Sequence, residues 1–230
     1  MASQTTLSGI VVALQAFYGR PKRPKASDPL GMILWENVLY LGNDEKREKA
    51  FDLLRKRVGL SAERILAAPE NVLREICKTG GILPDVQVQK LRRIAQIVLD
   101  QFGGDLRKAL GKQTIPQMKK SLKQFPAIAD TGAEKILLFW GKRPVLALES
   151  NGLRVLRRVG FGQELKTYGA TYRSVQEALK GQFPEDCAWL VRAHQLLRRH
   201  GQELCKRTQP LCEQCPLARS CRYYLTQMAG

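Results

Sequence analysis

Four cysteines near the end of the chain limit its possible folds more than any other feature. They have the spacing C-x6-C-x2-C-x5-C, at Cys205, Cys212, Cys215 and Cys221. Four thiols separated by short loops are typical of a metal site whose ligands are all cysteines. A disulfide framework does not suit a chain of 230 residues, because such frameworks stabilise small secreted domains. The residue types alone leave structural zinc and an iron–sulfur cluster as alternatives.

Apolar residues recur every three or four positions along most of the chain, as in 50–58 and 88–102. Alternation with period two is almost absent, so the pattern predicts an all-α fold. Residues 19–29 are basic and rich in proline, which predicts a linker after a first helix at about residues 5–17. Outside the cysteine-rich segment, Cys77 and Cys187 lie among apolar neighbours, and we expect both to be small buried side chains.

The charge balance indicates a polyanionic partner. Lys and Arg number 38 against 21 Asp and Glu, which gives a net charge of +17. No apolar run approaches the roughly 18–20 residues of a membrane span, and no basic region precedes the first apolar residues. We therefore expect a cytoplasmic, nucleoid-associated protein that does not bind membranes.

The cysteine segment, with His200 five residues before Cys205 and Pro216 after Cys215, resembles the C-terminal loop of endonuclease III and its adenine-glycosylase relatives. In that family the same spacing holds a [4Fe–4S] cluster, so the resemblance implies this cofactor on the four cysteines. It also implies that His200 is a structural hydrogen-bonding residue near the cluster.

The resemblance extends from Asp28 to Cys221. It implies a helix-hairpin-helix DNA glycosylase fold with a six-helix barrel at 28–145 and a cluster domain at 1–27 and 146–230. Double-stranded DNA would bind in the cleft between them. Trp35, Glu36 and Asn37 are candidates for the base pocket.

Residues 125–135 occupy the place of the family's hairpin, L-P-G-φ-G-x-K-T-A, where φ is apolar. Ala127 and Ala129 replace its two glycines, although Gly132 lies nearby. Glycines there let the backbone approach a DNA phosphate, so we expect a weakened or reshaped contact. An ordinary helix-turn-helix without a DNA role is the alternative.

Residues 144–155 resemble the segment that carries the family's catalytic aspartate, which falls on Glu149. The lyase lysine of the family falls on Thr131, which cannot form a Schiff base. Lys135, one helical turn further on, is a possible substitute whose side chain we expect to point elsewhere. Glu149 could stabilise an oxocarbenium-like sugar and orient water, or only cap the helix that follows it.

Further DNA contacts are expected from two regions. Arg154, Arg157 and Arg158 lie on one face of the predicted helix after Glu149, where they could hold phosphates. Leu41, beside Tyr40, replaces a glutamine that fills the gap left by a flipped base in the family. An apolar or aromatic wedge could serve there, or both residues could pack in the core.

Together these features predict a monomeric, monofunctional DNA glycosylase that hydrolyses the N-glycosidic bond of a base flipped out of damaged or mismatched DNA. A catalytically inactive DNA-binding module of the same fold is the main alternative. A bifunctional glycosylase and AP lyase, and a zinc-stabilised RNA-binding protein, are further alternatives.

Overall fold

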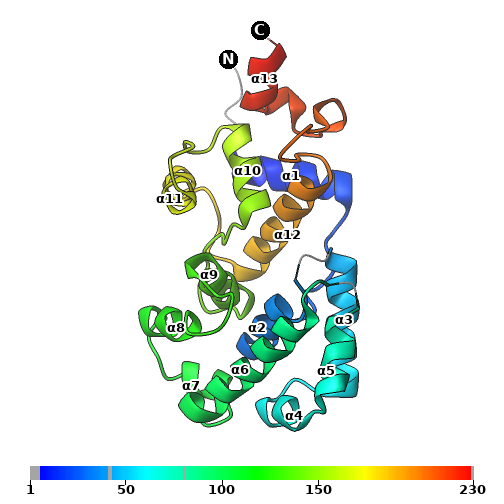
Figure 1. The fold of residues 1–230 in the computed structure, drawn as a ribbon. Coiled ribbons are helices and arrows are strands. Elements are labelled where there is room, and N and C mark those ends of the chain that lie inside the picture. Colours follow the sequence, from blue (N-terminus) through cyan, green and yellow to red (C-terminus); the bar gives the residue numbers. More distant parts are fainter. Residues whose placement is uncertain (1–5, 41–42, 80, 229–230) are drawn as a thin grey trace. The chain divides into compact units, whose positions relative to one another are not determined.

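The computed structural model describes residues 6–40, 43–79 and 81–228, and every regular element in these ranges is a helix (Figure 1). This confirms the all-α fold. The chain divides into two compact units, one of residues 24–142 and one of the residues up to Arg23 and from Arg143 onward. The sequence placed these boundaries a few residues later, at 27/28 and 145/146. No helix of the described residues is both long and apolar enough to cross a membrane.

The unit 24–142 is built around one apolar core. Ile33, Phe51, Leu91 and Ile94 are fully buried there. The central helix α6 packs against α2, α4, α5 and α7. The helices of this unit are α2 (Pro29–Asn37), α3 (Asp44–Arg57), α4 (Ala62–Ala67), α5 (Glu70–Cys77), α6 (Pro84–Phe102), α7 (Leu106–Leu110), α8 (Ile115–Leu122) and α9 (Asp130–Phe139).

The proline-rich linker lacks a helix, as predicted, up to Asp28, and α2 begins at Pro29. Residues 19–28 contain no helix. Asp28 then caps α2, because its carboxylate accepts the Gly31 N–H at 2.9 Å. Pro29 occupies the first helical position, where its missing N–H leaves no hydrogen bond unmade.

The hairpin consists of α8, residues 123–129 and α9. Ala127, where the family has its first glycine, has φ of +61° and is exposed, whereas Ala129 has an ordinary φ of −98°. The buried Asn37 fixes this loop, because its side-chain amide donates to Pro126 O at 2.9 Å and to Ile33 O at 3.0 Å. The loop therefore adopts a left-handed conformation that favours glycine, although an alanine occupies the position.

The second unit packs α12 against α10 and α1. Gly201 allows the contact with α10, since a Cβ there would lie 2.7 Å from both Cβ and O of Asn151. The helices of this unit are α1 (Leu7–Tyr18), α10 (Ser150–Val159), α11 (Tyr168–Ala178), α12 (Cys187–Glu203) and α13 (Arg222–Met228), with the short 3₁₀ turns Cys212–Gln214 and Ala218–Ser220 in the cysteine-rich loop.

The two outlying cysteines differ in burial. Cys77 is fully buried in the core, which confirms the expectation for this residue. The expectation was wrong for Cys187, which is partly exposed because it is the first residue of α12, next to the capping residue Asp186.

We expect Ala127→Gly to raise the free energy of unfolding by about 0.5–1 kcal/mol, because it relieves the left-handed conformation of an L-residue. Ala129→Gly is the matched control. It should change the free energy of unfolding little, because Ala129 is not strained and the unfolded-state entropy that glycine adds is offset by the preference for glycine over alanine at the N-cap of α9. Urea denaturation of the full chain measures both. Equal destabilisation by the two substitutions would contradict the strain at position 127.

Candidate functional site

Glu149 lies at the N-cap of α10, and both of its carboxylate oxygens are hydrogen-bonded. Oε1 accepts the Gly152 N–H at 2.7 Å, and Oε2 accepts a hydrogen bond from the Asn151 side-chain amide at 2.7 Å. The helix N-terminus favours the negative charge of this group. The capping role considered from sequence is therefore present, and it holds a partly buried carboxylate in one orientation.

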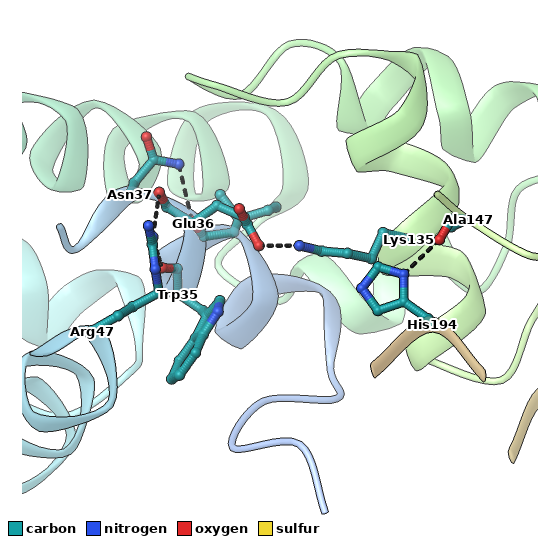
Figure 2. A network of polar contacts seen from close by, with 8 residues as sticks. Trp35, Glu36, Asn37, Arg47, Lys135, Ala147 and His194 are labelled. Atoms are coloured by element: carbon teal, nitrogen blue, oxygen red, sulfur yellow. Dashed lines mark hydrogen bonds and ion pairs between the residues drawn. The ribbon is translucent and has the colours of Figure 1, made fainter. Parts of the chain in front are cut away.

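The extended segment before Glu149 is fixed by side chains from α11 and α12. Three consecutive carbonyl groups each accept one hydrogen bond, so the backbone that leads to Glu149 has little freedom. The bonds are Gln176 Nε2 to Leu146 O at 2.5 Å, His194 Nδ1 to Ala147 O at 2.5 Å and Tyr168 O–H to Leu148 O at 3.0 Å, the second of which is drawn in Figure 2.

Arg154 connects this cap to the cysteine-rich loop. Its Nη2 donates to Asn151 Oδ1 and to Gly201 O, both at 2.7 Å. Its Nε donates to Cys205 O at 2.9 Å. A continuous chain of hydrogen bonds thus runs from the Glu149 carboxylate through Asn151 and Arg154 to the first cysteine of the loop.

Arg158 and Arg157 were expected to bind phosphate, but the structure gives them different partners. Arg158 is only 8 % exposed, and its guanidinium donates to Lys206 O at 2.7 Å and Arg207 O at 3.1 Å. Because its donors face the loop, Arg158 holds the loop's main chain rather than a ligand. Arg157 forms an ion pair with Glu164 at 2.9 Å and stays partly exposed.

A cavity of about 940 Å³ lies next to the N-terminus of α10. Glu164 is the only acidic residue of its lining. Lys206 and Arg207 are exposed, so their charges are accessible to a polyanion. The cationic residues of the lining are Arg154, Arg157, Arg158, Lys206 and Arg207.

The four loop cysteines lie close enough to influence one another electrostatically. Burial raises the pKa of Cys215 to about 11, and it also raises the pKa values of Cys212 and Cys221. Electrostatic repulsion from neighbouring cysteine sulfurs raises these pKa values further. No group of three or more His, Cys, Asp or Glu side chains in the described residues already has the arrangement of a metal site. The donor set nevertheless fits a thiophilic metal, because a cation would stabilise the gathered sulfurs as thiolates.

His200 lies beside this loop, as the sequence suggested. Its Nε2 is 3.4 Å from Cys215 Sγ. Burial lowers the pKa of His200 to about 4, so the ring is neutral near pH 7.

In the unit 24–142, Lys135 of α9 donates a hydrogen bond to the carboxylate of Glu36 in α2 (Figure 2). Arg47 holds the backbone of this part of α2 by donating to Trp35 O at 3.0 Å and to Glu36 O at 3.2 Å. Sequence reasoning named Lys135 and Glu36 separately and missed their pairing, because they are far apart in the chain. Thr131 is partly buried one turn before Lys135.

The wedge candidates are only partly described. Tyr40 is 44 % exposed, so it does not pack in the core, while Leu41 lies outside the described residues. The loop before α6 adds exposed apolar side chains that the sequence did not single out, since Ile82 and Leu83 are 52 % and 54 % exposed. This loop contacts Tyr40 through a hydrogen bond from Ile82 N to Tyr40 O at 3.3 Å.

Comparisons with known proteins identify proteins that are similar to this chain in sequence and in fold. No protein-family model matches the chain. The chain is 26 % identical over 210 residues to endonuclease III of Thermotoga maritima, covering 91 % of this chain and 90 % of the relative. Among solved structures, a trapped endonuclease III–DNA covalent intermediate matches with a TM-score of 0.71 and 18 % identity, covering 98 % of this chain and all of that one. A thermostable thymine-DNA glycosylase matches with a TM-score of 0.72 and 20 % identity, covering 96 % and 97 %.

The chain thus has the helical fold of the helix-hairpin-helix glycosylases. Its sequence is similar to that of endonuclease III, and its fold is that of the endonuclease III-like helix-hairpin-helix proteins.

We expect Arg154→Met to lower the free energy of unfolding by about 3 kcal/mol, because three acceptors lose a charged donor. Arg157→Met, three residues further along α10, is the matched control and should cost less than about 1 kcal/mol, since it breaks only a solvent-exposed ion pair. Chemical denaturation of the two purified variants and of the unsubstituted protein compares the two. Similar losses would argue against the bridging role of Arg154.

Proposed function

We propose that this chain is a monofunctional DNA glycosylase that binds damaged or mismatched duplex DNA and hydrolyses the N-glycosidic bond of a flipped base. The observation that carries the proposal is a carboxylate fixed at a helix N-terminus beside a cationic cavity. The homologous endonuclease III and the similarly folded thymine-DNA glycosylase support a role in DNA repair. The protein acts as a cytoplasmic, nucleoid-associated monomer, with functional domains at 28–145 and at 1–27 plus 146–230.

Glu149 supplies the chemistry in this proposal. As the bond between C1′ and the base nitrogen breaks, the sugar becomes positively charged, and the Glu149 carboxylate stabilises that charge. The same group orients a water molecule and accepts its proton as the new C–O bond forms; the base has left with the bonding electron pair and receives that proton. Asn151 and Gly152 hold the carboxylate through their hydrogen bonds, so it need not reorganise during the reaction.

Strand cleavage by a lyase is not part of the reaction. Thr131 has no amine, and Lys135 is engaged by the Glu36 carboxylate. Borohydride should therefore trap no covalent complex between the protein and abasic DNA.

Cys205, Cys212, Cys215 and Cys221 hold a [4Fe–4S] cluster in this proposal. The cluster is structural, since cysteine fills all four ligand positions and no position remains for substrate. When bound it stabilises the loop that carries Lys206 and Arg207 and that Arg154 ties to α10. Metal analysis of the purified protein should find about four irons per chain.

The hairpin and the cationic cavity contact the DNA backbone. Ala127, Ala129 and Gly132 form the hairpin surface next to the N-terminus of α9, while Tyr40 and Leu41 enter the duplex as a wedge. Phosphates bind the cations that line the cavity, which include the exposed Lys206 and Arg207 and, at its wall, Arg154 and Arg157. Arg158 contributes by holding the loop in place.

Lys206→Gln should weaken binding to all duplexes to a similar extent and reduce the slope of log K against log salt by about 1, because one phosphate contact is lost. The control is Lys180→Gln, since Lys180 is exposed outside this cavity and pairs with Glu177. Fluorescence anisotropy at several salt concentrations measures the slope. A slope unchanged by Lys206→Gln would remove this residue from the interface.

The inactive DNA-binding module remains a second candidate for one specific reason. Both oxygens of Glu149 are already occupied by hydrogen bonds within the N-terminal turn of α10. A carboxylate used only as a cap would explain the same geometry without catalysis.

Excision assays on duplexes with uracil, oxidised pyrimidines, 8-oxoguanine mispairs, alkylated purines and abasic sites separate the two candidates. We expect strand breaks that appear only after alkali treatment, and Glu149→Gln should lower their rate by at least about a hundredfold while DNA binding persists. Glu149→Asp is the companion variant, because it keeps the cap and the charge but shortens the reach. Tight binding without excision of any of these lesions would favour the inactive module.

A further inference from the structure

In the second unit, a series of polar side chains in contact has no role in the proposed excision reaction. His200 is only 1 % exposed, yet both of its ring nitrogens contact polar groups. Nδ1 is 3.1 Å from the Tyr18 hydroxyl, and Nε2 is 3.4 Å from Cys215 Sγ. Three groups from α1, α12 and the cysteine-rich loop are thus connected in series.

The neighbour of His200 in α12 fixes the position of Tyr18. The Arg199 guanidinium lies 4.6 Å from the centre of the Tyr18 ring, and its Nη1 donates to Tyr18 O at 3.2 Å. The Tyr18 and His200 rings meet edge to face with their centres 5.9 Å apart. Arg199 and His200 are neighbours in α12, so the same helical turn positions the Tyr18 ring and the nitrogen that its hydroxyl contacts. The Tyr18 hydroxyl is therefore held next to His200 Nδ1.

When Cys215 Sγ binds a metal, only one distribution of protons over Tyr18, His200 and Cys215 satisfies both hydrogen bonds. A neutral imidazole has one N–H and one lone pair. A metal-bound thiolate has no proton, so it can only accept, and Nε2 must then be the nitrogen that carries hydrogen. Nδ1 is left with its lone pair, which accepts the Tyr18 O–H.

We propose that Tyr18 and His200 form a relay that fixes this tautomer and donates a hydrogen bond to the metal-bound sulfur of Cys215. The inference rests on the metal centre of the proposed function but not on base excision. Both residues are positioning residues, because they act on the metal through its ligand. A hydrogen bond to a ligand sulfur withdraws negative charge from it, which stabilises the reduced form of the metal centre and slows metal loss.

The first test measures the tautomer in the metal-loaded full chain, after its metal content has been determined. Nitrogen-15 NMR of the histidine rings should find His200 protonated at Nε2 and unprotonated at Nδ1. Protonation at Nδ1 would overturn the relay while leaving the metal centre intact. A purified protein without metal would overturn the metal centre of the proposed function and the relay with it.

The second test uses Tyr18→Phe, which removes only the hydroxyl. Iron loss to a chelator should become about tenfold faster, and the reduction potential should fall, because the orienting donor of His200 is gone. Tyr223→Phe is the matched control, since the ring of Tyr223 stacks on Arg158 beside the same loop, 4.5 Å from its guanidinium. An unchanged potential and chelation rate in Tyr18→Phe would overturn the proposal. Equal changes in both variants would do the same, because they would indicate a general loosening of the loop.

Discussion

The guanidinium of Arg154 is the interaction on which the candidate site depends. It bonds at the same time to the residue that holds Glu149 and to the backbone of Cys205. Because one guanidinium donates to three acceptors, a movement of one acceptor disturbs the hydrogen bonds to the other two. The orientation of the Glu149 carboxylate and the path of the cysteine-rich loop are therefore linked, although they lie more than fifty residues apart in the chain.

The hairpin illustrates a different constraint, in which tertiary contacts override local preference. An alanine adopts a left-handed conformation that favours glycine, and Asn37 fixes the loop by donating a hydrogen bond to the carbonyl of Pro126. The left-handed turn is thus present at position 127 with a methyl group on its exposed surface. Such a side chain changes the exposed surface of the loop without requiring a different fold.

Much of the fold could be predicted from the sequence, because apolar residues at helical spacing identify buried faces and proline and glycine mark the ends of helices. The cysteine spacing likewise identified the loop that His200 approaches. Contacts between distant segments were not predictable, such as the Lys135–Glu36 pair and the close approach of Gly201 to Asn151. Arginine spacing on α10 indicated a basic face, but it could not distinguish the buried Arg158 from the accessible Arg157, since that depends on the loop packed above them.

The most direct test of the link between loop and carboxylate is amide hydrogen exchange in α10 before and after removal of the metal proposed for the cysteine-rich loop. Gly152 N–H is bonded to Glu149, so its protection reports whether the cap is formed. If the loop supports the cap through Arg154, metal removal should accelerate exchange at residues 150–154 by roughly tenfold or more. Rapid exchange confined to residues 205–221, with α10 unchanged, would contradict the account.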